Sequence, residues 1–102
     1  MFSENAKTFV QGAIDAETNA AISKWGEKYS SLHEGYAVLK EEVEEARDEQ
    51  MYIRNGFYKV WNGVKVGELK KEDVQQIREH AEKLALEAVQ VAAVCNKILN
   101  SL

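Results

Sequence analysis

Four carboxylates fall within five consecutive positions near the middle of the chain, at Glu41, Glu42, Glu44 and Glu45. In a helix, positions i, i+1 and i+4 project from one side, so Glu41, Glu42 and Glu45 would present three carboxyl groups together. Hard divalent cations such as Mg²⁺ and Mn²⁺ take oxygen ligands, and repulsion among clustered acids favours a cation between them. The alternative is a solvated acidic face, which is the common situation of charge runs on helices.

A second polar pair lies toward the C-terminal end, where Glu87 and Gln90 directly precede the apolar residues Ala88 and Val91. Their one-turn spacing places both side chains at the border of a core-facing stripe. Taken alone, such a pair is an ordinary polar position beside an apolar seam. If its helix faces the helix of the glutamates, the two sets would meet at one metal ion, which would indicate an enzyme rather than a scaffold.

The segments that precede and carry the glutamates have the pattern of helices, and the chain of 102 residues contains no proline. Apolar residues recur at helical spacing from about residue 3 to 25, and Gly26 is the predicted stop. A second helix is predicted to begin at Ser31, because Ser31 and Glu34 form a capping-box pattern. The glutamates border its core-facing residues, which are Leu32, Leu39, Val43, Ala46 and Ile53.

Two Asn-Gly pairs follow, and the first of them, Asn55-Gly56, is predicted to end this helix. The second, Asn62-Gly63, lies between β-prone residues, so residues 57–66 are predicted to form a β-hairpin. An ordered irregular loop is the alternative over the same range. A two-stranded hairpin is marginally stable by itself, so it would have to pack against the helices.

The last helix is predicted to begin between residues 70 and 73 and to carry apolar residues in alternating steps of three and four. This seam consists of Val74, Ile77, Ala81, Leu84, Ala88, Val91, Cys95, Ile98 and Leu102, widened by Ala85, Ala92 and Leu99. The predicted fold is therefore a single all-α domain over residues 1–102. A chain this short buries a modest core, so we expect a homodimer or tetramer whose association completes a four-helix core.

Charge and composition exclude several classes of function. The chain has 13 basic and 17 acidic residues, a net charge of −4, and no basic stripe for nucleic acid. No apolar run reaches about 18 residues and no signal-peptide pattern is present, so we expect no membrane span. A single cysteine, Cys95, excludes an internal disulfide and favours the cytoplasm. Neither His33 nor His80 belongs to the Glu-x-x-His pattern of di-iron bundles.

The order of the two motifs resembles the MazG-like, all-α nucleoside triphosphate pyrophosphohydrolases, which carry EExxE on one helix and ExxD on a later one. Glu41, Glu42 and Glu45 match the first motif, and Glu87 matches the start of the second, whereas Gln90 stands where the family has aspartate. Further likeness lies in residues 24–26, 33–39 and 87–94. The resemblance covers about residues 20 to 100 and is to a short subgroup of phage and bacterial proteins. EExxE alone is a weak signal, and its position before this last helix makes the combination moderately specific.

This resemblance implies Mg²⁺- or Mn²⁺-dependent hydrolysis of an NTP or dNTP to a monophosphate and pyrophosphate, in a nucleotide-pool house-cleaning role in the cytoplasm. The implied metal ligands are Glu41, Glu42, Glu45, Glu87 and Gln90, and the implied catalytic residues are Glu41, Glu42 and Glu45. Because an amide replaces a carboxylate at Gln90, we expect a weaker metal site or the loss of a second metal.

Three further residues are candidates for binding the nucleotide. Lys40 and Lys97 are candidates for phosphate binding and Trp25 for stacking on a base, although surface lysines and core aromatics are the ordinary interpretation of such residues. A helical scaffold, with the acids as a solvated or vestigial face, is the rival hypothesis for the whole chain.

Overall fold

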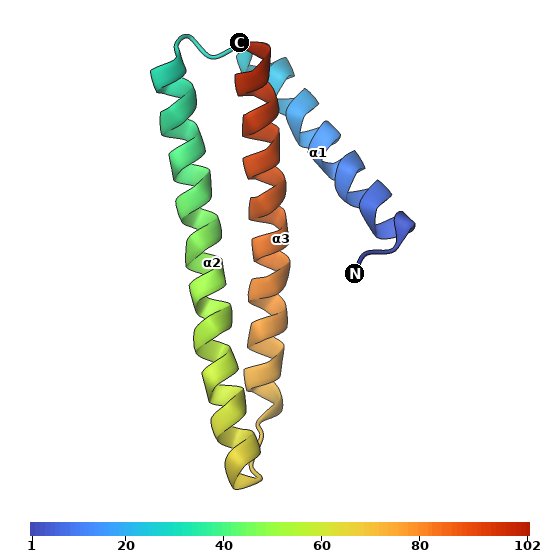
Figure 1. Cartoon of the computed structure of the whole chain (residues 1–102), viewed down its shortest axis with the longest axis vertical. Coiled ribbons are helices and arrows are strands. Elements are labelled where there is room, and N and C mark those ends of the chain that lie inside the picture. The colour runs from blue at the N-terminus through green and yellow to red at the C-terminus, as the bar shows by residue number, and fades with distance from the viewer.

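A computed structural model describes residues 1–102 and contains three helices and no strand. They are α1 (Glu4–Trp25), α2 (Leu32–Val66) and α3 (Lys71–Asn100). In Figure 1, α2 and α3 run antiparallel and side by side, and α1 leans away from α3 toward its own N-terminus. The prediction of an all-α helical bundle is confirmed.

The predicted starts of α1 and α2 are confirmed by their caps. The Ser3 hydroxyl accepts a hydrogen bond from the Ala6 amide at 3.1 Å, and the Ser31 hydroxyl accepts one from the Glu34 amide at 3.1 Å. Each bond satisfies one of the amide donors that the first turn of a helix leaves free. Gly26 follows α1 with φ of 92°, and Gly67 ends α2 in the left-handed region with φ of 72°, where glycine carries no steric penalty.

The prediction of a hairpin or loop over residues 57–66 was wrong, and so was the prediction that Asn55-Gly56 ends the helix. α2 continues without interruption to Val66. A Cβ atom on Gly56 would lie 2.8 Å from Ile77 Cγ1, and one on Gly63 would lie 3.0 Å from Leu69 Cα. These glycines allow α3 and the turn before it to approach α2 closely, so tertiary packing overrides the local turn signal.

Substitution of Gly56 tests this explanation. We expect Gly56→Ala to lower the free energy of unfolding by about 1 kcal/mol, because overpacking against Ile77 (about 1–3 kcal/mol) exceeds the gain in helix propensity of about 1 kcal/mol. Gly12 is the matched control, since nothing lies within 4 Å of a Cβ added there. Gly12→Ala should stabilise the chain by about 0.5–1 kcal/mol in urea unfolding. Equal stabilisation by both substitutions would show that Gly56 is not a close-contact position.

The three helices lie in a single layer. α3 is in the middle and contacts both other helices, whereas α1 and α2 do not contact each other. The molecule measures 55 × 31 × 21 Å, and Figure 1 views the layer down the shortest of these axes. Its radius of gyration is 17.3 Å, against about 13 Å for a compact domain of 100 residues.

A single layer encloses very little. Ala93 and Val94, at 3% and 8% exposure, are the only buried apolar side chains that form a core. Many large apolar side chains on all three helices are exposed instead. None of the three helices combines the length and the apolar character needed to cross a membrane.

Candidate metal and nucleotide site

The antiparallel pairing of α2 and α3 brings together Glu42 and Glu45 of α2 and Glu87 of α3. One carboxylate oxygen from each of the three lies within 4.8 Å of the others. We call this set the carboxylate cluster. Seven residues are about two helical turns, so Gly35, Glu42, Glu49, Gly56 and Gly63 form one line along α2. This line faces α3, since Cβ atoms on Gly35 and Gly56 would lie 3.1 Å from Ile98 and 2.8 Å from Ile77.

The carboxylate cluster carries more negative charge than its surroundings neutralise. Partial burial and the neighbouring Glu45 carboxylate raise the pKa of Glu42 above its usual value. A hydrogen bond shared with the Glu87 carboxyl raises the pKa of Glu45, and burial and the Glu87 charge add to this effect. None of the ion pairs in the structure includes these three residues. Glu87 Oε2 is buried and receives no hydrogen bond, so the cluster needs a proton or a cation for full stability.

The two other predicted metal ligands are placed differently. Glu41 is exposed on α2 and does not belong to the carboxylate cluster. The Gln90 amide nitrogen donates a hydrogen bond to Glu17 Oε2 of α1 at 2.9 Å. This contact between α1 and α3 was not predicted from the sequence, because periodicity within one helix gives no information on which residue of another helix it meets.

A pocket of about 490 Å³ opens directly beside the carboxylate cluster, between the C-terminal end of α1, the segment after it, and α2 and α3. This volume lies in the range of small-molecule sites, about 300–1,000 Å³. The pocket is lined by Ala21, Trp25, Lys28, Tyr29, Ser30, Glu34, Val38, Glu42, Gln90, Val94 and Lys97. Glu42 therefore belongs both to the carboxylate cluster and to the pocket wall.

Lys97 is the most unusual residue of this pocket. It is only 4% exposed, and its ammonium nitrogen lies 4.3 Å from the centroid of the Tyr29 ring. No carboxylate forms an ion pair with it. The contact of its ammonium group with the Tyr29 ring is a cation–π interaction. Trp25 also lines the pocket and is exposed. By contrast, Lys40 pairs with Glu44 at 3.8 Å on the surface and is not part of the pocket.

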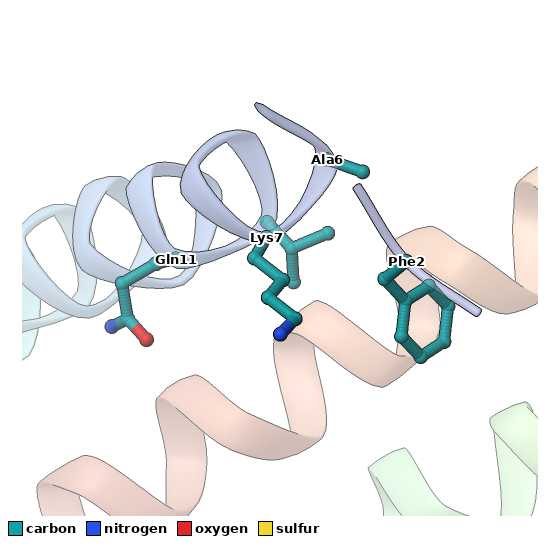
Figure 2. A pocket seen from close by; sticks show the side chains of 5 residues that line it. Phe2, Ala6, Lys7 and Gln11 are labelled. Atoms are coloured by element: carbon teal, nitrogen blue, oxygen red, sulfur yellow. The ribbon is translucent and has the colours of Figure 1, made fainter. Parts of the chain in front are cut away.

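A second pocket, of about 390 Å³, lies at the N-terminal end of α1. Figure 2 shows that its labelled side chains come from α1 and the residues just before it, with α3 passing beneath. Its lining consists of Phe2, Ala6, Lys7, Val10 and Gln11 and contains no carboxylate. It therefore offers no carboxylate oxygen to a magnesium ion.

A histidine–glutamate pair also joins α2 to α3 and was not predicted. His80 Nδ1 and Glu49 Oε2 are 2.6 Å apart, and the Tyr52 ring stacks on His80 with a centroid distance of 4.6 Å. The sequence did contain a signal for it: Glu49 follows Glu42 by seven residues, and His80 precedes Glu87 by seven. Two helical turns along each helix therefore separate this pair from the carboxylate cluster, about 10 Å away.

The raised pKa values of Glu42 and Glu45 predict how stability depends on pH when metal is removed with EDTA. Because the folded state holds these protons more tightly than the unfolded chain, their contribution is fully present below about pH 4.3. It is lost as the pH rises through the higher pKa values of the folded protein. Relative to Glu42→Gln, the wild type should lose stability in thermal unfolding as the pH rises above about 4.3. A constant difference between the two proteins above this pH would contradict the pKa assignment.

The structure thus brings Glu42, Glu45 and Glu87 into one cluster, places Trp25, Gln90 and Lys97 in the pocket beside it, and leaves Glu41 and Lys40 on the surface. Comparisons with protein-family models, with curated proteins and with solved structures found no match to this chain.

Proposed function

We propose that this chain is a MazG-like, Mg²⁺-dependent nucleoside triphosphate pyrophosphohydrolase. Its main support is the carboxylate cluster, in which a buried Glu87 oxygen has no hydrogen-bond donor and two neighbouring carboxyls have raised pKa values. Oxygens bound to one Mg²⁺ lie at most about 4.2 Å apart, since each is about 2.1 Å from the ion. The 4.8 Å spread of the cluster is close to this limit, so small side-chain rotations would suffice to bind the ion.

In this proposal Glu42, Glu45 and Glu87 hold the ion, with Mn²⁺ as an acceptable substitute. A bound ion would neutralise part of the triphosphate charge and lower the pKa of the attacking water. Two carboxylates outside the cluster are available to accept the proton of that water: Glu41, which is adjacent to Glu42 in the chain, and Glu34, which lines the pocket. The oxygen of water bonds to the α-phosphorus, the bond to the bridging oxygen breaks, and pyrophosphate leaves.

The neighbouring pocket is the proposed nucleotide site. Lys97 lines the pocket and forms no ion pair with a carboxylate, so a phosphate group is a ligand that suits its ammonium group. Trp25 offers an exposed ring face for stacking on a base. The substrate is an NTP or dNTP, consumed in the nucleotide pool of a bacterial or phage-infected cytoplasm. A homodimer or tetramer is part of the same proposal.

The second candidate is a helical scaffold without catalytic activity. It is favoured by one observation, the large number of exposed apolar side chains on all three helices, which is typical of assembly surfaces. Both hypotheses predict self-association, so an oligomeric state does not separate them. Only the enzyme hypothesis predicts an activity that depends on metal and nucleotide, so this dependence separates the two.

The direct test is release of pyrophosphate from a panel of NTPs and dNTPs in the presence of Mg²⁺ or Mn²⁺. We expect metal-dependent release that EDTA abolishes and that Glu45→Gln reduces strongly. Glu44→Gln is the matched control, because Glu44 lies in the same acidic run but pairs with Lys40 outside the cluster. Its activity should remain close to wild type. Absence of release with every nucleotide and both metals would favour the scaffold.

A further inference from the structure

Gln90 is the only amide side chain that lines the pocket beside the carboxylate cluster. An amide donates hydrogen bonds from its nitrogen and accepts them at its oxygen, so its orientation decides which ligand groups it can bind. The Gln90 nitrogen Nε2 donates a hydrogen bond to Glu17 Oε2 of α1 at 2.9 Å. An ionised carboxylate has no proton to donate, so the group of Gln90 that bonds to Glu17 must be the amide nitrogen.

The carbonyl oxygen Oε1 of Gln90 is therefore left for a ligand. The nitrogen and the oxygen of an amide point in different directions, so Oε1 is directed away from Glu17 while Nε2 is bonded to it. Glu87 Oε2 is the only buried side-chain polar atom without a partner. Gln90 Oε1 accepts no hydrogen bond from the chain and is not buried in this way, so it is accessible from the pocket.

A neighbouring contact holds α1 against α3 at this point. Asn96 Nδ2 donates a hydrogen bond to the Thr18 hydroxyl oxygen at 3.1 Å. Thr18 is only 9% exposed, and its own hydroxyl donates to the Ile14 carbonyl at 2.7 Å. The Thr18 hydroxyl thus acts as donor and acceptor at once. Because Thr18 is fixed in this way, the adjacent Glu17 is held within reach of Gln90.

Glu17 also belongs to the side of α1 that forms the pocket. Glu17, Ala21 and Trp25 are spaced four residues apart, so they follow one line along α1. Ala21 and Trp25 line the pocket, and Glu17 lies one helical turn before them. The hydrogen bond between Glu17 and Gln90 therefore joins α1 to α3 at the border of the pocket.

We infer that Glu17 is a positioning residue that directs the Gln90 carbonyl oxygen into the pocket, so that the pocket selects a ligand group that donates a hydrogen bond. Ionised phosphate oxygens only accept hydrogen bonds, so the selected group is an N–H of the base or an O–H of the sugar. The identity of the ligand rests on the proposed function, whereas the orientation of Gln90 rests on the chain alone. Without Glu17, the amide would present either end to the pocket and the selection would be lost.

The orientation of Gln90 is tested without any ligand by ¹⁵N–¹H spectra of its side-chain amide, assigned by the signals that Gln90→Met lacks. Glu17→Met should move one of the two amide proton signals upfield, because it removes a charge-assisted hydrogen bond. Asp15→Met is the matched control. It removes the same charge from α1, but the Asp15 carboxylate accepts from Gln11 of the same helix, so the Gln90 signals should stay in place. Identical Gln90 signals in the wild type and Glu17→Met would overturn the positioning role.

Selection is tested by the Kd values of α,β-methylene CTP and of three analogues that each lack one donor, measured with Mg²⁺. The uridine analogue lacks the base amino group, and the 2′-deoxy and 3′-deoxy analogues each lack one hydroxyl. The wild type should bind one of the three about three- to tenfold more weakly than the CTP analogue, the equivalent of one hydrogen bond. Which analogue is weakened identifies the donor as base or sugar.

Glu17→Lys should remove this preference or reverse it. The lysine ammonium group donates to Gln90 Oε1, so the amide nitrogen turns toward the pocket and a ligand donor no longer finds an acceptor there. The added positive charge strengthens binding of all four analogues alike, so it cancels in the ratio of their Kd values. Equal binding of the four by the wild type, or an unchanged ratio in Glu17→Lys, would overturn the inference and leave the proposed function intact. Binding of none of them would overturn both.

Discussion

Glu87→Gln is expected to lower metal-dependent pyrophosphate release at least about 100-fold, since residues that only orient metal ligands already contribute about 10–100-fold. The substitution replaces a carboxylate whose buried Oε2 has no donor with a neutral amide. In the absence of metal it should have the opposite effect on stability. The new amide N–H group can donate to the Glu42 or Glu45 carboxylate and one negative charge is removed, so the metal-free protein should be stabilised by about 1 kcal/mol.

Lower activity together with higher stability in the absence of metal would distinguish a metal ligand from a glutamate with a purely structural role. A structural role for Glu87 predicts lower stability for the variant with and without metal. Activity is measured by pyrophosphate release, and stability by urea unfolding in EDTA, with Glu44→Gln as the control in both. Wild-type activity in Glu87→Gln would remove Glu87 from the proposed ligand set.

Lys97→Met is expected to weaken nucleotide binding by about 10–100-fold, the equivalent of a charged hydrogen bond worth about 1.5–3 kcal/mol. Methionine keeps an apolar stem, and the loss of the cation–π contact with Tyr29 is offset by the removal of a charge from a largely buried residue, so the free energy of unfolding should change little. Because the ammonium group lies over Tyr29 in the pocket wall, the lost interaction is with the ligand rather than with an acidic residue of the chain.

Lys40→Met is the matched control, because Lys40 is also near the acidic run but pairs with Glu44 outside the pocket. Binding is measured with a non-hydrolysable nucleotide in the presence of Mg²⁺. If Lys40→Met weakens binding as much as Lys97→Met, the pocket is not the nucleotide site.

Helix positions could be predicted wherever a signal was local. Ser31 and Glu34 gave the start of α2, and the seam from Val74 onward gave α3. The same local logic failed at Gly56 and Gly63, where Asn-Gly pairs that favour a turn in isolation lie inside a helix. These glycines leave room for Ile77 and Leu69 to approach α2 closely. Which residue approaches a given glycine is set by tertiary packing, so a local sequence signal does not identify it.

In the candidate site, too, positions within one helix could be predicted, whereas contacts between helices could not. Spacing within α2 and α3 predicted which glutamates border the core, and the structure brings Glu42, Glu45 and Glu87 together. Pairwise contacts between helices were not predictable, including Gln90 with Glu17 and His80 with Glu49. The heptad line through Gly35, Glu42, Glu49, Gly56 and Gly63 does contain the information that these acids face another helix. This information is recognised only when glycine is treated as a residue at which another helix can approach closely.

Glu42, Glu45 and Glu87 are proposed to bind a divalent cation in the folded protein. The most direct measurement is thermal unfolding of the wild type and Glu42→Gln with and without millimolar Mg²⁺ or Mn²⁺, with Glu44→Gln as the control. At a metal concentration of about ten times Kd, the wild type and the control should gain about 1.4 kcal/mol in unfolding free energy. Glu42→Gln should gain none. An unfolding temperature of the wild type that does not respond to either metal, even with a non-hydrolysable nucleotide present, would contradict the metal site.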